Sequence, residues 1–253
     1  DNGLDYQANQ ILVSCGGKQS FFNLSLALLN AGDEVVIPAP YWVSYPDMVK
    51  MAEGVPVVIE TNAAARFKIN AAQLDAAITN KTKLVVLNSP SNPSGMSYTK
   101  AELAELGAVL RNYPDVLVAT DDMYEHILWT DEPFNNILTV NPDLYDRTIV
   151  LNGVSKAYSM TGWRIGYAAG PQPLIAAMKK IQSQSTSNPT SISQVAAQAA
   201  LEGDQQCVKD MVKVFKQRHD YIVEALNEID GIECLAGDGT FYVFTDFSGM
   251  QAK

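Results

Sequence analysis

The sequence predicts an α/β fold in which a mainly parallel β-sheet is covered by helices on both faces. Short apolar runs alternate with helical patterns along most of the chain, which is the order that parallel strands and their connecting helices produce. Several of these runs are apolar at nearly every position, as expected for strands buried on both faces. The 253 residues are 47% hydrophobic, which is enough for one large domain or slightly more.

The predicted elements follow one another in a regular order. Seven apolar runs are expected as strands of the sheet: residues 11–13, 34–37, 55–60, 84–88, 116–120, 148–151 and 165–169. Helical patterns lie at residues 18–30, 44–52, 71–79, 99–112, 173–182, 191–201 and 208–229. The last helix is followed by two strand-like runs, at residues 232–235 and 240–246. We therefore expect a large domain over residues 1–203 and part of a smaller one over residues 204–253.

Composition excludes several functional classes. The formal net charge of −10 and the sequence pI of about 4.6 argue against a nucleic-acid or anionic-membrane surface, since both select basic patches. The three cysteines form no CxxC pair and the two histidines are far apart, so neither a disulfide framework nor a metal site is expected. Without a secretory leader, lipidation signal or membrane-length apolar run, a cytoplasmic enzyme is expected. The chain begins without methionine and stops after a strand-like run, so we expect a piece of a longer protein.

The segment of residues 152–170, NGVSKAYSMTGWRIGYAAG, combines a lysine and an arginine in a loop after a predicted strand. Loops at strand ends often carry chemistry. Lys156 alone is most simply a surface charge. Arg164 changes this interpretation, because a lysine that forms a Schiff base with an aldehyde cofactor needs the cofactor held nearby, and a guanidinium suits a phosphate.

Other strand ends supply suitable partners for such a cofactor. Gly16 and Gly17 precede a predicted helix, where a glycine pair is either a tight turn or an anion site. Tyr41, Trp42 and Tyr45 form an aromatic cluster that is either core or interface, and Trp42 could instead lie flat against a ring. Asn92 lies in the loop NSPSNPSG, which alone would be only a turn. Asp121 and its neighbour Asp122 are candidates for a metal, a helix cap or a contact to a ring nitrogen.

Taken together, these segments resemble the fold type I, class I aminotransferases that depend on pyridoxal 5'-phosphate (PLP). The resemblance rests on GGKQ at 16–19, PYWVSY at 40–45, NSPSNPSG at 88–95, DDMYEH at 121–126 and SKAYSMTGWRIGY at 155–167. These motifs occur in the family's order and cover almost the whole chain. GGKQ with PYWVSYP is most similar to the branch of bacterial aspartate and aspartate/prephenate enzymes. The resemblance implies a three-layer α/β/α large domain with a seven-stranded sheet, plus part of a small α+β domain.

The resemblance also implies a role for each motif residue. Lys156 would form the Schiff base with PLP and move the substrate proton, and Asp121 would face the pyridine nitrogen. Tyr124 and Asn92 would bond the ring oxygen. Trp42 would stack on the ring.

The phosphate and the substrate would be held by the remaining motif residues. Arg164, with the backbone of Gly17 and Lys18, would hold the phosphate, while Lys18 would meet the distal carboxylate of a dicarboxylic substrate. Substrate contacts are thus expected from Lys18, Trp42 and Asn92. Many members of the family that this chain resembles have a phosphate-binding serine three residues before the lysine, where this chain has Gly153, so fewer side-chain donors are expected for the phosphate.

The implied reaction moves an amino group from an amino acid to a 2-oxo acid such as 2-oxoglutarate. A PLP-dependent lyase or synthase, or a domain that retains only the fold, stays open as an alternative. In the family a homodimer shares its active sites, and a small-domain arginine holds the substrate carboxylate. This chain has five arginines, and apart from Arg164 none lies in a motif that matches that clamp. We therefore expect weak substrate binding.

Overall fold

The structure is a computed structural model that describes residues 2–250. A seven-stranded sheet forms its centre, in the spatial order β1-β7-β6-β5-β4-β2-β3. Its strands are β1 (Ile11–Ser14), β2 (Glu34–Pro38), β3 (Val55–Ile59), β4 (Thr82–Asn88), β5 (Leu117–Asp121), β6 (Thr148–Gly153) and β7 (Gly166–Ala169). The pairs from β6 to β3 are parallel, and only β7 runs antiparallel to its two neighbours. The predicted seven-stranded, mainly parallel sheet is confirmed.

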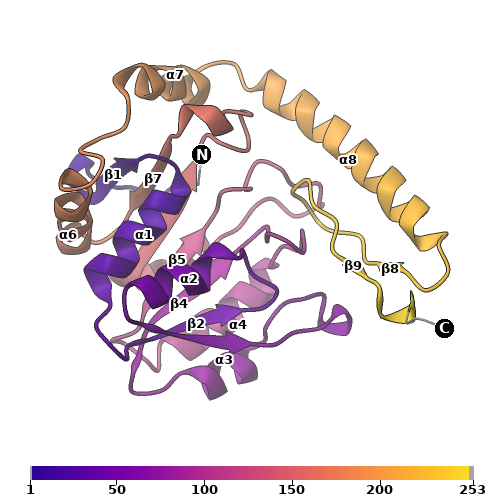
Figure 1. Cartoon of the computed structure of the whole chain (residues 1–253), viewed down its shortest axis with the longest axis horizontal. Coiled ribbons are helices and arrows are strands. Elements are labelled where there is room, and N and C mark those ends of the chain that lie inside the picture. Colours follow the sequence, from indigo (N-terminus) through magenta and orange to yellow (C-terminus); the bar gives the residue numbers. More distant parts are fainter. Residues whose placement is uncertain (1, 251–253) are drawn as a thin grey trace.

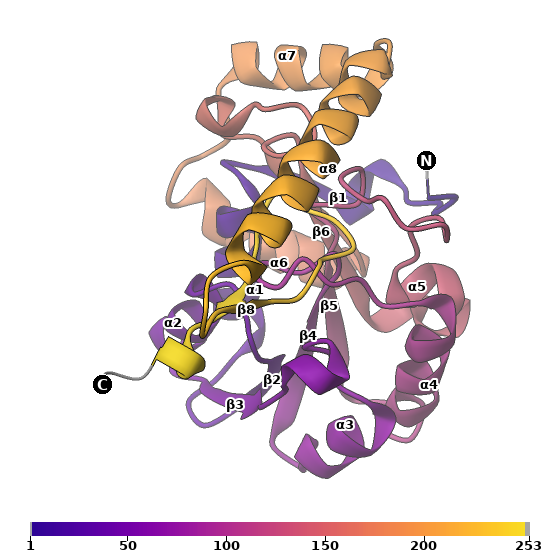
Figure 2. The ribbon, with the colours of Figure 1, turned by 90° about the vertical axis from the view of Figure 1, so that its right-hand side faces the viewer.

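Helices cover both faces of the sheet, as Figure 2 shows. On one face lie α1 (Gly17–Leu28), α2 (Ser44–Met51) and α6 (Gln172–Ser183), and on the other lie α3 (Ala71–Ala77), α4 (Lys100–Leu110) and α5 (Ile137–Val140). Adjacent strand residues pack into opposite cores: Val35 of β2 joins the first core, and Val36 joins the second. This arrangement explains why the strands read as continuous apolar runs rather than alternating ones.

The helices begin and end where local side chains allow. Thr99 caps α4 by accepting from the Glu102 backbone N–H, and Glu102 reaches back to the N–H of Thr99, which is the capping box that its sequence favours. Asn70 and Gln73 do the same for α3. The short helix α5 was not expected, because four residues carry too little periodicity to be recognised. Asn136 caps it.

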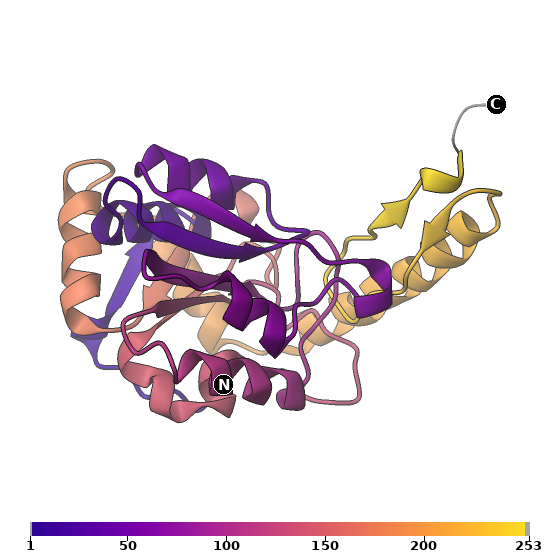
Figure 3. The same ribbon diagram turned by 90° about the horizontal axis from the view of Figure 1, so that it is seen from below.

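Beyond the sheet, the chain forms α7 (Ser191–Glu202) and the long helix α8 (Gln206–Asn227), which extends away from the sheet in Figures 1 and 3. A separate two-stranded sheet of β8 (Glu233–Cys234) and β9 (Thr245–Asp246) lies beside α8. The expected strand over residues 240–246 is wrong for its first five residues. Thr240 has a left-handed φ of 69°, and its N–H bonds to the Ile127 carbonyl, so this segment turns back toward the large sheet. The division between residues 203 and 204 stays a prediction.

Within residues 2–250, no helix combines the length and the apolar character that crossing a bilayer requires.

Candidate active site

A cavity of about 260 Å³ opens where the chain leaves β4, β5 and β6. The carboxyl ends of these parallel strands meet at one edge of the sheet, which is the usual location of ligand sites in such folds. The N-terminus of α1 faces the same space. The lining residues are Gly17, Lys18, Trp42, Tyr45, Asn88, Asn92, Asp121, Met123, Tyr124, Leu151, Ser155, Lys156, Thr161, Arg164 and Tyr242.

All eight residues that the resemblance assigned to cofactor binding line this one cavity. They come from five separate segments of the chain, so their convergence is a property of the fold. Sequence reasoning did not assign the remaining lining residues to the site. For Tyr45 a signal was present in its aromatic cluster, whereas Tyr242 lies in the segment that had been expected as a plain strand.

Lys156 lies in the loop between β6 and β7 and is half-buried. Its Nζ is 5.9 Å from the ring centroid of Tyr124 and 5.5 Å from that of Phe241. Burial lowers the pKa of Lys156, and the positive charge of Arg164 lowers it further, while the Asp121 carboxylate acts in the opposite direction. A lowered pKa increases the fraction of neutral amine, which is the form that attacks a carbonyl.

Asp121 ends β5, and its carboxylate borders the cavity. The Tyr45 hydroxyl donates to one carboxylate oxygen, and the Met123 N–H donates to the other at 3.2 Å. Burial raises the pKa of Asp121, whereas these two hydrogen bonds and the positive charge of Lys156 lower it. The carboxylate is therefore held in one orientation, with Tyr45 behind it.

Asp122 faces the protein interior rather than the cavity. It accepts hydrogen bonds from Thr120 Oγ1 at 2.6 Å and from Asn136 Nδ2 at 2.6 Å. Successive residues of a strand point to opposite faces, so Asp121 and Asp122 do not present a shared set of metal ligands. Burial raises the pKa of Asp122 to about 8, although its two hydrogen bonds lower it.

The raised pKa of Asp122 predicts a pH-dependent stability. Between about pH 4 and pH 8 the folded chain retains a proton that the unfolded chain has released, so the free energy of unfolding falls as pH rises. Asp122→Asn removes this titration. We expect the free energy of unfolding of the variant, relative to that of the unaltered chain, to increase by several kcal/mol from pH 5 to pH 8, on the order of the full linkage. Thermal unfolding at both pH values measures this gain, and a constant Tm difference would contradict it.

Arg164 lies across the cavity beside the start of α1. Its backbone is left-handed, with φ 54°, and its guanidinium donates to the carbonyls of Thr161 at 2.7 Å and Cys15 at 3.2 Å. The first helical bonds of α1 run from Gln19 and Ser20 to the Gly16 carbonyl, so the N–H groups of Gly17 and Lys18 precede them. Free N–H groups at a helix N-terminus beside a guanidinium form an anion site.

Gly16 makes the approach of Arg164 possible. Its φ is 90°, and a Cβ there would overlap the Arg164 guanidinium. Gly16→Ala is therefore expected to displace Arg164 and weaken PLP binding by about tenfold or more. Gly162→Ala is the matched control, because a Cβ at Gly162 meets nothing within 4 Å. Equilibrium titration with PLP compares them, and equal dissociation constants for both variants would refute this role of Gly16.

The aromatic side of the cavity is built from α2 and its preceding loop. The Trp42 ring packs edge-on against Tyr45, with centroids 5.2 Å apart. Lys18 Nζ lies 5.2 Å from the Trp42 ring centroid, within the range of a cation–π contact. Lys18 and Trp42 are thus neighbours, and the exposed lysine can turn from the ring toward an anionic ligand.

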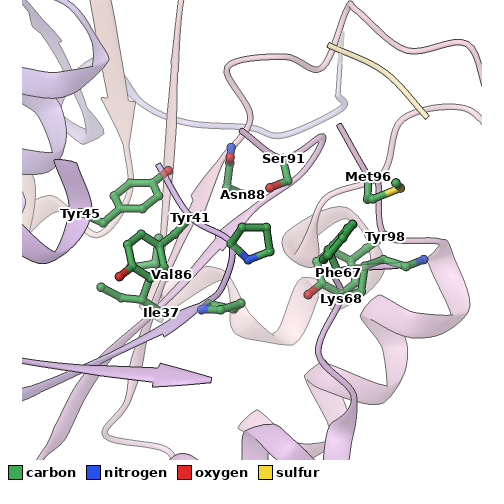
Figure 4. A pocket seen from close by; sticks show the side chains of 12 residues that line it. Ile37, Tyr41, Tyr45, Phe67, Lys68, Val86, Asn88, Ser91, Met96 and Tyr98 are labelled. Carbon is green, nitrogen blue, oxygen red and sulfur yellow. The ribbon is translucent and has the colours of Figure 1, made fainter. Parts of the chain in front are cut away.

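A second, smaller cavity lies behind the first and shares Tyr45 and Asn88 with it. Figure 4 shows its labelled lining side chains, among them Phe67, Met96 and Tyr98. It holds about 20 Å³, which is enough for a single water molecule and not for an organic ligand. The cavity of about 260 Å³, which Lys156, Asp121 and Arg164 line, is therefore the candidate active site.

Comparison with known proteins gives the family. The family model for class I and II aminotransferases matches residues 1–253. The aspartate/prephenate aminotransferase of Nitrosomonas europaea is 61% identical over 246 residues, which cover 97% of this chain and 62% of that protein. The aspartate/prephenate aminotransferase of Cereibacter sphaeroides is 53% identical over the whole chain and 63% of its own length.

Solved structures agree. The crystal structure of the Rhizobium meliloti aspartate aminotransferase aligns with a TM-score of 0.96 and 49% identity, over 98% of this chain and 62% of that one. The aspartate aminotransferase of Thermus thermophilus with maleate aligns with a TM-score of 0.89 and 40% identity, over 97% of this chain and 63% of that one. The chain thus spans less than two thirds of these relatives, and over that span it belongs to the class I and II aminotransferase family.

Proposed function

We propose that this chain carries the cofactor site of a PLP-dependent aminotransferase. The reaction would move an amino group between an amino acid, such as aspartate or another dicarboxylic or aromatic substrate, and a 2-oxo acid such as 2-oxoglutarate. The observation that carries the proposal is that the Lys156 amine, the Asp121 carboxylate and the Arg164 guanidinium border one cavity. These three groups match the aldehyde, the ring nitrogen and the phosphate of PLP.

The chemistry of the lining residues fits PLP. Arg164, with the N–H groups at the start of α1, provides an anion site, and Gly16 leaves room for it. Trp42 offers an aromatic face, and Tyr124 and Asn92 offer donors for a ring oxygen. When bound, PLP supplies an electron sink for the negative charge that develops on the substrate Cα.

The chain's own residues would attach the cofactor, move protons and contact the substrate. Lys156 would link to the cofactor and, once released, would take the proton from the substrate Cα and return one during transfer. Asp121, held by Tyr45, would keep a proton on the ring nitrogen. Lys18, Trp42 and Asn92 would contact the substrate.

The substrate carboxylates are expected to be held weakly by this chain. Among the described residues only one arginine, Arg164, borders the cavity. Arg66 pairs with Asp238, and Arg111 pairs with Asp143. Arg147 donates to backbone carbonyls. Efficient amino transfer would then require a longer chain that spans the relatives' length, and we propose that it works as a homodimer in the cytoplasm.

Two measurements test the proposal. Titration with PLP should produce the visible absorbance of a lysine-linked cofactor. The absence of any new absorbance would indicate a domain that retains only the fold and does not bind the cofactor. Product analysis with aspartate and 2-oxoglutarate, in this chain and in the longer one, should show glutamate and oxaloacetate. Products formed without any amino acceptor would indicate a lyase instead. Equal kcat/KM in the two chains would show that the substrate clamp lies within residues 1–253.

A further inference from the structure

Tyr242 reaches the cavity from a segment far along the chain. Its hydroxyl oxygen lies 2.7 Å from that of Tyr124, so one hydroxyl donates to the other. Tyr124 is buried and Tyr242 is half-buried, and both line the cavity with Lys156. The two residues are 118 positions apart in sequence, so their contact depends on how the later segment docks against the sheet.

Backbone hydrogen bonds hold that later segment in place. The Asp238 and Gly239 N–H groups donate to the Gly95 carbonyl at 2.9 and 3.0 Å, and Thr240 N–H donates to the Ile127 carbonyl at 2.8 Å. Gly239 passes so close to Ile127 that a Cβ there would overlap its carbonyl. The turn then continues into Tyr242, whose N–H donates to Thr240 Oγ1 at 3.1 Å. Tyr242 is therefore placed by the main chain, independently of any ligand.

The hydrogen-bonding capacity of Tyr124 makes this contact informative. A tyrosine hydroxyl carries one proton and two acceptor lone pairs. Burial raises the pKa of Tyr124, and the contact with the Tyr242 hydroxyl raises it further, which is the sign expected when Tyr124 donates to Tyr242. A negatively charged ring oxygen can only accept a hydrogen bond, so the single proton of Tyr124 would turn to it when PLP enters the cavity. The Tyr242 hydroxyl, 2.7 Å away, would then donate its own proton to the Tyr124 oxygen.

We propose that Tyr242 is a positioning residue that donates to the Tyr124 oxygen and so directs the Tyr124 proton into the cavity. This inference rests on the proposed function, because the acceptor would be the ring oxygen of PLP. Chains of hydrogen bonds polarise one another, so Tyr124 becomes a stronger donor when Tyr242 donates to it. Tyr242 would act on the cofactor through Tyr124, without reacting itself.

The test is the pH midpoint of the visible absorbance of the Lys156-linked cofactor. A donor to the ring oxygen stabilises its negative charge, which is greatest when the neighbouring imine nitrogen is unprotonated. Weakening that donor should therefore raise the midpoint. We expect Tyr242→Phe, which removes only the hydroxyl, to raise it by about half a pH unit, and Tyr124→Phe to raise it further.

A double-mutant cycle distinguishes an effect of Tyr242 that passes through the Tyr124 hydroxyl, called the relay below, from a general structural effect of the substitution. In the Tyr124→Phe background, Tyr242→Phe should add no shift. Tyr113→Phe is the matched control, because it removes an equivalent hydroxyl bond, to Asp75 at 2.8 Å, on the protein surface. No shift in Tyr242→Phe, or an equal shift with and without the Tyr124 hydroxyl, would overturn the relay alone. If the unaltered chain acquires no visible absorbance with PLP, the proposed function and the relay both fall.

Discussion

Replacing Lys156 by alanine is expected to abolish covalent capture of PLP and to slow amino transfer by about 10⁴-fold or more. The variant loses both the amine that links to the aldehyde and the group that moves the Cα proton. Lys156 is suited to both tasks, because burial and Arg164 lower its pKa. Incubation with PLP, reduction with borohydride and peptide mass spectrometry locate the attachment.

The matched control is Lys180→Ala, which removes an exposed lysine from α6. Its labelling at Lys156 should equal that of the unaltered chain. Reduced cofactor spread over surface lysines, or found in unchanged amount in Lys156→Ala, would show that the amine in the cavity is not the point of attachment.

Asp121→Asn is expected to lower kcat by about 100-fold or more, which is roughly 3 kcal/mol on the barrier, while changing PLP affinity little. Asparagine retains the shape of the side chain but cannot supply the negative charge that keeps a proton on the ring nitrogen. Tyr45 and the Met123 N–H would still orient the side chain. Steady-state kinetics and a PLP titration measure the two quantities separately.

Asp122→Asn provides an internal control at the adjacent residue. Its side chain is buried away from the cavity, and the pKa of about 8 leaves it mostly protonated at neutral pH, so asparagine changes its charge little. Turnover should stay near that of the unaltered chain. Near-normal turnover in Asp121→Asn, or a large loss only in Asp122→Asn, would mean that the wrong neighbour was assigned to the ring nitrogen.

The sheet could be predicted because strands covered on both faces contain continuous apolar runs, as in residues 35–37 of β2 and 84–87 of β4. The choice of Lys156, Arg164 and Asp121 needed the motifs together, since each residue alone had a simpler interpretation. The strand register then explains why Asp121 rather than Asp122 borders the cavity: neighbours on a strand face opposite ways.

The parts that were missed depend on distant contacts. Tyr242 meets Tyr124 only because residues 237–240 dock on the main chain of Gly95 and Ile127, and no local pattern encodes that docking. The left-handed turn at Thr240 likewise interrupts a run whose alternation favours a strand. Tyr45 of the aromatic cluster is buried, which fits a core position rather than an interface, and its hydroxyl bond to Asp121 gives it a second role.

The antiparallel pairing of β6 with β7 has a further consequence for how this protein can vary. Gly153 and Gly166 are direct partners across that pair, so the loop that carries Lys156 and Arg164 leaves and rejoins the sheet at a single rung. Closing a loop at fixed ends costs little more when the loop lengthens. An exposed position of this loop such as Gly162, where an added Cβ meets nothing within 4 Å, can therefore accept an inserted residue without shifting the strands beneath it. The two ends of the loop, Val154 and Ile165, are buried in one cluster with Ala197, so the placement of Lys156 and Arg164 on the cavity is fixed by the fold.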